Sequence, residues 1–503
     1  MTHLKVFTVS FFIIFLISGC NQEAEKNKPN IVFFFVDDMG WQDTSVPFHT
    51  ETTKLNKQYY TPNMEQLARE GVKFTQAYAS ALCSPSRISL MTGMNAARHR
   101  VTSWTLRKDV SPDQQNKNIQ APDWNVNGLS AEPNQPRTVY TQTLPQLLKK
   151  AGYKTIHAGK AHFGAKDTSG ENPLNLGFDV NIAGHAAGGP GSYWAKYNFS
   201  ADWRSPGNHI WDVPGLEKYH GTDIYLTEAL TLEANKAISK AVEEKKPFYL
   251  YMSHYAIHAP WEKDNRFYKK YIDAGLSEFD ATYASMLEGM DKSLGDIQAN
   301  LIRLGVDENT VIVFMSDNGA PKQAARNLPL RGHKISPYEG GTRVPMMVKW
   351  PGITKPETVN NQYVIIEDIF PSFLEMAGLK EEAGKSIDGI SFLPLLAKKG
   401  QYPIDRPLYW HFPNTYDQPP YSSVRKGDWK LIYHHTDRKI EVFNLKEDLG
   451  EQTDLSETNA AKTKELANLL TEHLIATKAQ MPTDKISGKL VEYPIDAFMN
   501  KTE

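Results

Sequence analysis

The sequence lacks an excess of either positive or negative charge. Its 56 lysines and arginines nearly balance 58 acidic residues, which gives a formal net charge of −2. No basic cluster and no regular repeat is evident, so neither nucleic-acid binding nor a repeat architecture is expected. Charged residues make up 23% and hydrophobic residues 40% of the chain, as in ordinary globular proteins. The length of 503 residues suits a large α/β enzyme.

Long apolar runs are lacking after the first 20 residues. The start, MTHLKVFTVSFFIIFLISGC, has an apolar run from Val6 to Ile17 that is short for a membrane span and typical of a secretory signal. Its last four residues, ISGC, resemble the bacterial lipobox, which implies cleavage before Cys20 and a lipid on its sulfur. Plain secretion with cleavage nearby is the alternative. We therefore expect residues 1–20 to be a signal peptide, and the protein to be exported to the bacterial periplasm or cell envelope as a membrane-anchored lipoprotein.

Cysteine is scarce, because the chain has only Cys20 and Cys83. If Cys20 carries a lipid, Cys83 has no partner for an internal disulfide. A free thiol is a liability in an exported protein. The stretch around it, ALCSPSRISLMTG (81–93), could simply bury the thiol in a helix. The other interpretation gives Cys83 a chemical role.

Short apolar runs alternate with helical patterns along most of the chain. The predicted strands are residues 31–36, 153–159, 248–253 and 311–316. The predicted helices, each ending at a glycine, are residues 61–71, 143–152 and 282–305. This alternation predicts an α/β fold with a large, mostly parallel sheet sandwiched by helices, which we assign to a main catalytic domain at 21–400.

The pattern changes towards the C-terminus. Residues 401–503 contain short β-like runs, a Gly-Asp turn and a helical pattern at 459–480. They predict a smaller C-terminal α+β subdomain containing an antiparallel sheet. Residues 101–142 and 183–194, rich in Asn, Pro, Gln or Gly, are expected to be loops rather than core.

Acidic and amide side chains follow two of the predicted strands. Asp37 and Asp38 end one strand, and Asp317 and Asn318 end another. Ligands of parallel sheets bind at these carboxyl ends. Oxygen donors of this kind suit Ca²⁺ or Mg²⁺, whereas zinc prefers nitrogen and sulfur. Each acid could instead cap a helix or a turn, but together they favour a metal site.

Several potential cations accompany these acids: Arg87, Lys160, Lys334 and, when protonated, His162 and His258. Individually, each could be a surface lysine or a hydrogen-bonded core histidine. A metal with several convergent cations would suit an anionic ester. Catalysis would then combine electrostatic stabilisation of a transferring group with proton delivery to a poor leaving group.

These residues resemble the formylglycine-dependent type I sulfatases of the alkaline phosphatase superfamily, from about Lys28 to Leu455. CSPSR (83–87), followed by Leu90, Thr92 and Gly93, is similar to the family's C-x-P-x-R signature, which directs oxidation of the cysteine to formylglycine. The segments AGYKTIHAGKAHFG, AIHAP, MSDNGA and LRGHKISPYEGGTRVP follow in the family's order. The chain looks like the bacterial carbohydrate sulfatases of this family.

The resemblance implies a nucleophile and a metal. Oxidised Cys83 would be hydrated to a diol that attacks the sulfur of a sulfate ester, and the second hydroxyl would let the aldehyde re-form and expel sulfate. A maturation enzyme would have to act on Cys83 first. The implied ligands of Ca²⁺, with Mg²⁺ as the alternative ion, are Asp37, Asp38, Asp317, Asn318 and an oxygen of modified Cys83.

The resemblance also implies roles for the cations. Arg87 would steady the nucleophile and the metal site. Lys160 and His162 would contact the sulfate or the diol, with His162 as the base of the release step. His258 and Lys334 would bind sulfate near the bridging oxygen, with His258 as the general acid.

The predicted substrate is a sulfated carbohydrate, and galactose or N-acetylgalactosamine sulfate in a glycan is the specific expectation. HRVTSWTLRK (99–108) and YMSHYAIHAP (251–260) look like segments of bacterial sulfatases acting on these sugars. Aromatic or polar loop residues could rim the pocket, although any one of them could instead fill the core: Trp104, Arg107, Trp124, His185, Tyr193, Trp194 and His411.

Three other functions remain open from the sequence. They are a broad arylsulfatase, a phosphonate or phosphate monoester hydrolase of the same superfamily, and a non-catalytic glycan-binding lipoprotein. Asn318 favours a sulfate ester, because the related phosphatases typically pair the preceding aspartate with histidine. The complete set of nucleophile and metal positions argues against the non-catalytic alternative.

Overall fold

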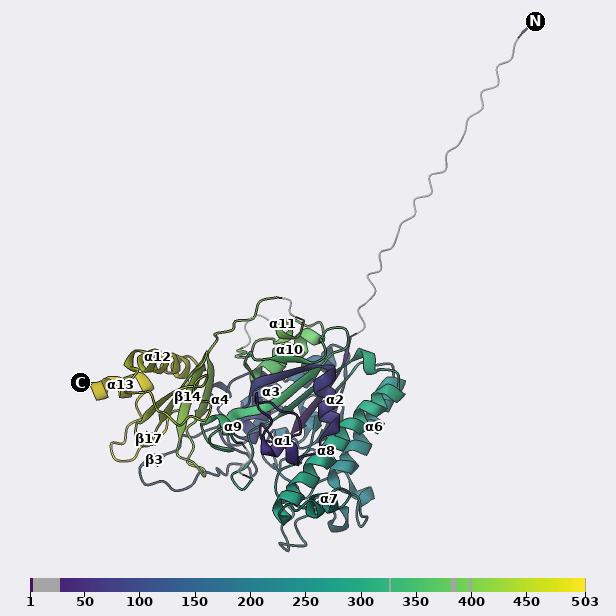
Figure 1. Ribbon diagram of the computed structural model, residues 1–503, viewed down its shortest axis with the longest axis horizontal. Coiled ribbons are helices and arrows are strands. Elements are labelled where there is room, and N and C mark those ends of the chain that lie inside the picture. The colour runs from purple at the N-terminus through teal and green to yellow at the C-terminus, as the bar shows by residue number, and fades with distance from the viewer. Residues whose placement is uncertain (3–27, 325–326, 381–385, 398–399, 503) are drawn as a thin grey trace.

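The computed structural model describes residues 1–2, 28–324, 327–380, 386–397 and 400–502. The apolar N-terminal run and Cys20 lie outside these residues, so the signal peptide and the lipid anchor stay predictions. Among the described helices, none combines the length and apolar character that crossing a bilayer requires. Figure 1 shows a large α/β body with a smaller C-terminal sheet and its helices at one side.

The large body is built on a nine-stranded sheet in the order β11-β2-β10-β9-β1-β8-β6-β7, with β12 also paired to β2. Its parallel part consists of β9 (Thr310–Ser316), β1 (Asn30–Val36), β8 (Phe248–Ser253), β6 (Lys154–Gly159) and β7 (Val180–Ile182). The strand β10 (Arg343–Lys349) runs antiparallel to both β9 and β2 (Val72–Tyr78). The short strands β11 (Thr358–Asn360) and β12 (Val364–Ile365) run parallel to β2. The predicted α/β fold with a mostly parallel sheet is therefore confirmed.

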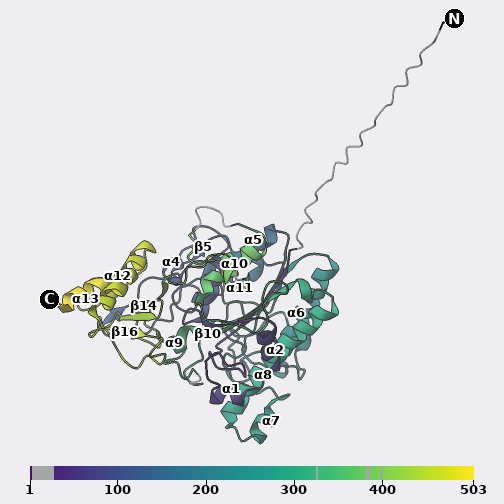
Figure 2. The ribbon, with the colours of Figure 1, turned by 45° about the horizontal axis from the view of Figure 1, so that its top comes forward.

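The strand β1 is buried on both faces, as its uninterrupted apolar sequence predicts. Ile31, Phe33 and Phe35 pack into one core, and the alternate residues of the strand pack into the other. On the first face lie α3 (Cys83–Thr92), α5 (Leu144–Lys150) and α10 (Ile369–Met376). On the second lie α2 (Pro62–Glu70), α6 (Leu226–Glu243) and α8 (Glu278–Arg303). Figure 2 shows these two helical layers separated by the sheet.

The helix α8 begins at Glu278, earlier than the predicted start at residue 282. Ser277 caps it, because its hydroxyl accepts a hydrogen bond from the backbone N–H of Asp280 at 3.1 Å. The other α-helices described before residue 400 are short: α1 (Lys54–Gln58), α4 (Ala96–His99), α7 (Tyr268–Asp273), α9 (Glu339–Thr342) and α11 (Leu393–Ala397).

The C-terminal part contains an antiparallel sheet, as predicted. It consists of β13 (Leu408–Phe412), β14 (Tyr421–Lys426), β15 (Trp429–His434) and β16 (Ile440–Asn444). The helix α12 (Ala460–Ala476) packs on β14 and β15, and α13 (Pro494–Thr502) packs on α12.

The expectation that residues 101–142 are loop rather than core is partly wrong. They contain β3 (Ile119–Gln120), β4 (Leu129–Ser130) and β5 (Val139–Tyr140), and β3 pairs with β17 (Thr483–Asp484). Trp124 and Val126 are buried in the same core as α3. Burial of these apolar side chains outweighs the polar composition of the segment.

Candidate active site

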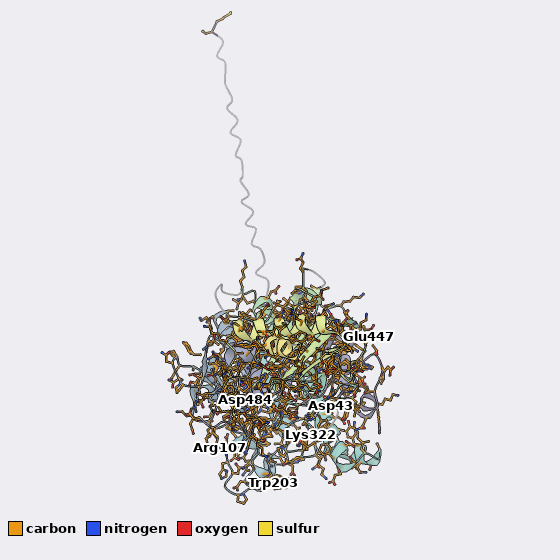
Figure 3. The ribbon with its side chains drawn as sticks, turned by 90° about the vertical axis from the view of Figure 1, so that its left-hand side faces the viewer. Asp43, Arg107, Trp203, Lys322, Glu447 and Asp484 are labelled. Atoms are coloured by element: carbon orange, nitrogen blue, oxygen red, sulfur yellow. The ribbon has the colours of Figure 1, made fainter. Side chains whose placement is uncertain are left out.

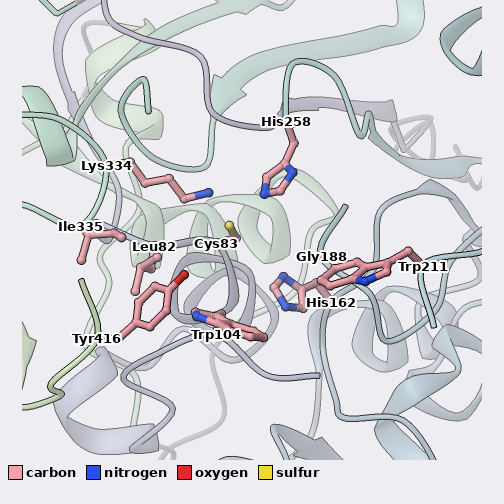
Figure 4. A pocket seen from close by; sticks show the side chains of 10 residues that line it. All are labelled: Leu82, Cys83, Trp104, His162, Gly188, Trp211, His258, Lys334, Ile335 and Tyr416. Atoms are coloured by element: carbon pink, nitrogen blue, oxygen red, sulfur yellow. The ribbon is translucent and has the colours of Figure 1, made fainter. Parts of the chain in front are cut away.

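The carboxyl ends of the central strands meet at a cavity of about 150 Å³. Its lining residues come from widely separated parts of the chain: Leu82, Cys83, Trp104, His162, Gly188, Trp211, His258, Lys334, Ile335 and Tyr416. Figure 4 shows Cys83 between Lys334 and His258 on one side and Trp104 and Tyr416 on the other. The strand ends therefore deliver their polar residues to one place, as parallel sheets commonly do.

Cys83 is the first residue of α3, and all ten residues of this helix are buried. The helix is anchored to the end of β9, because the Ser86 hydroxyl donates to the carbonyl oxygen of Asp317 at 2.6 Å. It ends at Gly93, whose φ of 72° is left-handed. Burial raises the pKa of the Cys83 thiol. The unmodified side chain is therefore protonated near pH 7 and a weak nucleophile.

Three side chains at the cavity floor could share a metal ion. Ligand atoms of Asp37, Cys83 and Asp317 all lie within 4.8 Å of one another. Burial and the neighbouring Asp317 raise the pKa of Asp37 well above its ordinary value. Lys160 offsets part of this effect, since its Nζ lies 2.6 Å from Asp37 Oδ2. The floor thus holds closely spaced carboxylates that a cation would stabilise.

Arg87 lies beneath the floor, one turn along α3 from Cys83. Its Nε and Nη2 donate to Asp317 Oδ2 at 3.2 and 2.8 Å. Its Nη1 donates to the Ser253 hydroxyl at 2.5 Å and to the Lys160 carbonyl at 3.2 Å. The guanidinium also lies 5.1 Å from the centre of the Phe35 ring. Arg87 therefore holds the ends of β1, β6, β8 and β9 around the helix that carries Cys83.

Asp38 faces the other side of the cavity. Its Oδ1 lies 2.6 Å from Lys334 Nζ and accepts a hydrogen bond from Asn318 Nδ2 at 2.7 Å. Burial alone would raise the pKa of Asp38, but Lys334 and His258 outweigh it and hold the pKa well below its usual range. Burial alone would lower the pKa of Lys334, but Asp38 outweighs burial and raises this pKa.

His258 approaches Asp38 through Nε2, at 3.9 Å from Asp38 Oδ2. Its Nδ1 lies 2.7 Å from the carbonyl oxygen of Ala259. A carbonyl can only accept, so Nδ1 carries the hydrogen and Nε2 is the atom free to exchange a proton in the cavity. Burial and Lys334 lower the pKa of His258 to about 4. The ring is therefore neutral near pH 7.

His162 is oriented in a similar way. Its Nε2 lies 2.7 Å from the carbonyl oxygen of Thr105 and 3.1 Å from the Ser84 hydroxyl, so Nε2 carries the hydrogen. Burial and Lys160 lower its pKa well below the ordinary value. Gly188 covers the ring closely, because a Cβ added there would lie 2.4 Å from His162 Cε1. Only glycine fits at this position.

The structure brings together all the residues predicted as nucleophile, metal ligands or catalytic cations. Cys83, His162, His258 and Lys334 line the cavity. The others lie directly beneath it through the contacts above: Asp37, Asp38, Arg87, Lys160, Asp317 and Asn318.

The residues predicted to bind substrate are more scattered. Trp104 lines the cavity, whereas Arg107 is exposed outside it. His185 contributes its backbone carbonyl to the N–H of His162, at 3.2 Å. His411 lies in β13 with one ring nitrogen 2.8 Å from the Ser422 hydroxyl and the other 3.1 Å from the Gln480 carbonyl, away from the cavity. The other three aromatics, Trp124, Tyr193 and Trp194, are buried in the hydrophobic cores.

Sequence reasoning missed several wall residues. Trp211 and Tyr416 are the two additional aromatic side chains, and Leu82, Gly188 and Ile335 complete the wall. Trp104 and Tyr416 meet edge to face, with ring centres 5.5 Å apart. The available signal was an aromatic residue inside a polar segment, as in NHIWD and NTYDQ.

The fold and the charged cavity together define an enzyme that acts on anionic esters. Comparison with known families gives two matches: Sulfatase, over residues 29–379, and N-sulphoglucosamine sulphohydrolase, C-terminal, over residues 333–480. The chain therefore belongs to the sulfatase family, and it is a hydrolase of sulfate esters.

Individual relatives agree with this assignment. The chain is 32% identical to mouse N-acetylgalactosamine-6-sulfatase over 79% of its own length and 71% of that protein. It is 28% identical to a sulfatase of Formosa agariphila over 95% and 94% of the two chains. Among solved structures, it is similar to Ps i-CgsB in complex with k-i-k-neocarrahexaose, with a TM-score of 0.73 and 26% identity over 94% and 97% of the chains.

Proposed function

We propose that the protein hydrolyses sulfate monoesters on carbohydrates, with galactose 6-sulfate or N-acetylgalactosamine 6-sulfate at the end of a glycan as the substrate. The observation that carries this proposal is the cavity itself. It places Cys83 among buried carboxylates and cations, with Trp104, Trp211 and Tyr416 as aromatic walls. Aromatic side chains present flat apolar faces of the kind that sugar rings stack on. We choose the 6-position of the sugar because the mammalian relatives are N-acetylgalactosamine-6-sulfatases.

The floor of the cavity suits a calcium ion. Asp37 Oδ1 and Asn318 Oδ1 are buried, and neither has a hydrogen-bond partner in the described part of the chain. With Asp38 and Asp317 they form a set of hard oxygen donors, which Ca²⁺ prefers. These four residues, with an oxygen on residue 83, would hold the ion. When bound, it would polarise the sulfate group and stabilise negative charge that develops on its oxygens.

We further propose that Cys83 is oxidised to formylglycine. The buried thiol faces the cavity at the start of α3, and CSPSR (83–87) has the signature that directs this oxidation. When hydrated, formylglycine would supply a hydroxyl nucleophile and a second hydroxyl for release of sulfate.

The chain's own side chains would bind the sulfate group and move protons. Three acidic side chains (Asp37, Asp38 and Asp317) meet three basic ones (Arg87, Lys160 and Lys334). A divalent ion would therefore leave the site positively charged, which favours an anionic ester.

His258 Nε2 is the atom that would give a proton to the leaving sugar oxygen. An anionic sulfate beside the ring would raise the pKa of His258, because it favours the imidazolium form. His162 would accept a proton at Nδ1, since its Nε2–H is committed to the Thr105 carbonyl.

The substrate proposal is tested by rates on matched esters. We expect N-acetylgalactosamine 6-sulfate or galactose 6-sulfate to be hydrolysed with a higher kcat/KM than 4-nitrophenyl sulfate, and the corresponding phosphate esters to be poor substrates. Removal of calcium by a chelator should abolish sulfate release, and added Ca²⁺ should restore it. A faster rate on phosphate esters would contradict the proposal, and equal rates on aryl and sugar sulfates would favour a broad arylsulfatase.

We also propose that the enzyme is exported and anchored through lipid on Cys20. The support is the ISGC tetrad, followed by a polar stretch (21–29) that would act as a tether before β1 begins at Asn30. Mass spectrometry of the mature N-terminus tests this proposal, because a lipid-modified Cys20 should be the first residue. Cleavage elsewhere with a soluble product would contradict it.

A further inference from the structure

Two chain segments leave the cavity wall and reach the surface together. Arg107 follows Trp104 by three residues, and Lys166 follows His162 by four. The segments pair with each other through a parallel bridge between Arg107 and Lys166, and the N–H of Lys166 donates to the Leu106 carbonyl at 2.8 Å. A chain advances at most about 3.6 Å per residue. The Cα atoms of Arg107 and Lys166 therefore lie within about 15 Å of the Cα atoms of Trp104 and His162 in the cavity wall.

The surface at the outer ends of these two segments, which we call the rim, carries unpaired positive charge. Arg107, Lys108 and Lys166 are all exposed, and no ion pair links any of them to another described residue. The nearby Asp109 shares Arg137 with Asp123, at 3.8 and 3.0 Å. Asp167 directly follows Lys166 and is exposed as well. Figure 3 shows Arg107 at the surface of the molecule.

The cavity wall also leads to acids. Tyr416, which meets Trp104 edge to face, is followed by the exposed Asp417, and Trp211 is followed by the half-buried Asp212. Cations therefore lie beyond Trp104 and His162, and acids lie beyond Tyr416 and Trp211. A sugar chain with negative charges would extend over the side chains of Arg107 and Lys166 and avoid Asp417, because like charges repel.

We propose that Arg107 and Lys166, assisted by Lys108, bind a second anionic group on the sugar next to the sulfated residue. The substrate is then a glycan with negative charges on adjacent sugars, a sulfate on the first and a sulfate or carboxylate on the second. Arg107 suits this role because a guanidinium can donate two parallel hydrogen bonds to either group. This inference rests on the proposed carbohydrate sulfatase function.

The test uses three disaccharides with a terminal N-acetylgalactosamine 6-sulfate, whose second sugar is neutral, carboxylated or sulfated. For the wild type, we expect KM to be about fivefold lower with either anionic second sugar, as exposed ion pairs permit, and kcat to change little. In the double variant Arg107→Gln/Lys166→Gln this advantage should disappear, while KM for the neutral disaccharide stays within about twofold. Raising the salt concentration should shrink the advantage in the wild type.

A matched control is Lys245→Gln/Lys246→Gln, which removes two exposed charges beside Asn30, at the amino ends of the strands. It should leave the preference intact. The inference is overturned if the wild type does not distinguish the three disaccharides, or if Arg107→Gln/Lys166→Gln raises KM equally for all of them. Failure to hydrolyse any of the three would count against the proposed function itself.

Discussion

Arg87 shows how one side chain can order a whole site. It is fully buried, and its guanidinium contacts Asp317, Ser253 and the Lys160 carbonyl at once. The sequence predicted its place in the site through the resemblance of CSPSR to the sulfatase signature. Its contacts could not be predicted, because Ser253 and Asp317 lie more than 160 residues away along the chain.

Replacing Arg87 with lysine keeps the charge but loses the planar set of donors. We expect Arg87→Lys to lower kcat/KM by about 100-fold and the free energy of unfolding by about 2–4 kcal/mol. Arg98→Lys is the control, since Arg98 forms a similar double contact with Asp388 away from the cavity. It should lose stability by denaturant unfolding but retain activity. An active Arg87→Lys enzyme would contradict the role given to the guanidinium.

Glu367 is a buried acid outside the active site. Asn95 Nδ2 donates to its Oε1 at 2.8 Å, and burial raises the pKa of Glu367 to about 8. The folded state therefore binds this proton more tightly than the unfolded chain, whose glutamate pKa is about 4.3, so stability is lost as pH rises between these values. Glu367→Gln should be about 2–4 kcal/mol more stable than the wild type at pH 9 and similar to it at pH 5. The measurement is the free energy of unfolding in denaturant as a function of pH. If it changes with pH in the same way for the wild type and Glu367→Gln, this account is refuted.

At the scale of elements, the ends of the parallel strands depend on close backbone contact. Gly159 ends β6 with a φ of +99°, and a Cβ there would lie 1.9 Å from the Ser253 carbonyl oxygen. The next residue, Lys160, donates its N–H to the same carbonyl at 2.7 Å. The apolar runs predicted the strands well, because burial on both faces leaves a clear pattern. The short strands at 119–140 were missed, since two-residue pairings leave almost no pattern.

Gly159→Ala should therefore separate the ends of β6 and β8 and displace Lys160. We expect a loss of about 2–4 kcal/mol in stability and at least a tenfold loss of kcat/KM. Gly152→Ala is a matched control, because Gly152 also has a left-handed φ, of +91°, but nothing lies within 4 Å of an added Cβ. It should cost about 1 kcal/mol without loss of activity. Equal behaviour of the two variants would show that the close contact is unimportant.

At the scale of the whole molecule, the C-terminal sheet supports the loop that carries Lys334. Lys430 of β15 is fully buried, with its Nζ 3.0 Å from Glu339 and 2.9 Å from Glu451. Tyr421 of β14 donates to the carbonyl of Ile335 at 3.1 Å. The sequence predicted both sheets. It did not predict their joint contribution to the cavity, because Tyr416 comes from a connection between two C-terminal strands whose polar composition is typical of any loop.

Lys430→Met should leave Glu339 and Glu451 buried without their shared cation. We expect a loss of about 3–5 kcal/mol in unfolding free energy. Lys426→Met, on the neighbouring strand, removes a half-exposed pair with Glu465 and should cost less than about 1 kcal/mol. Thermal and denaturant unfolding of the two variants measures the difference. Similar small losses would mean that the buried ion pairs do not hold the two parts together.

The most direct test of the proposed chemistry is the mass of the tryptic peptide at residues 74–87, from protein made with a maturation system, together with sulfate release by the same sample. The account predicts a peptide about 18 Da lighter than the cysteine form, and activity that rises in proportion to the converted fraction. Full sulfate release from protein whose Cys83 is still a thiol, or from a Cys83→Ala variant, would contradict it.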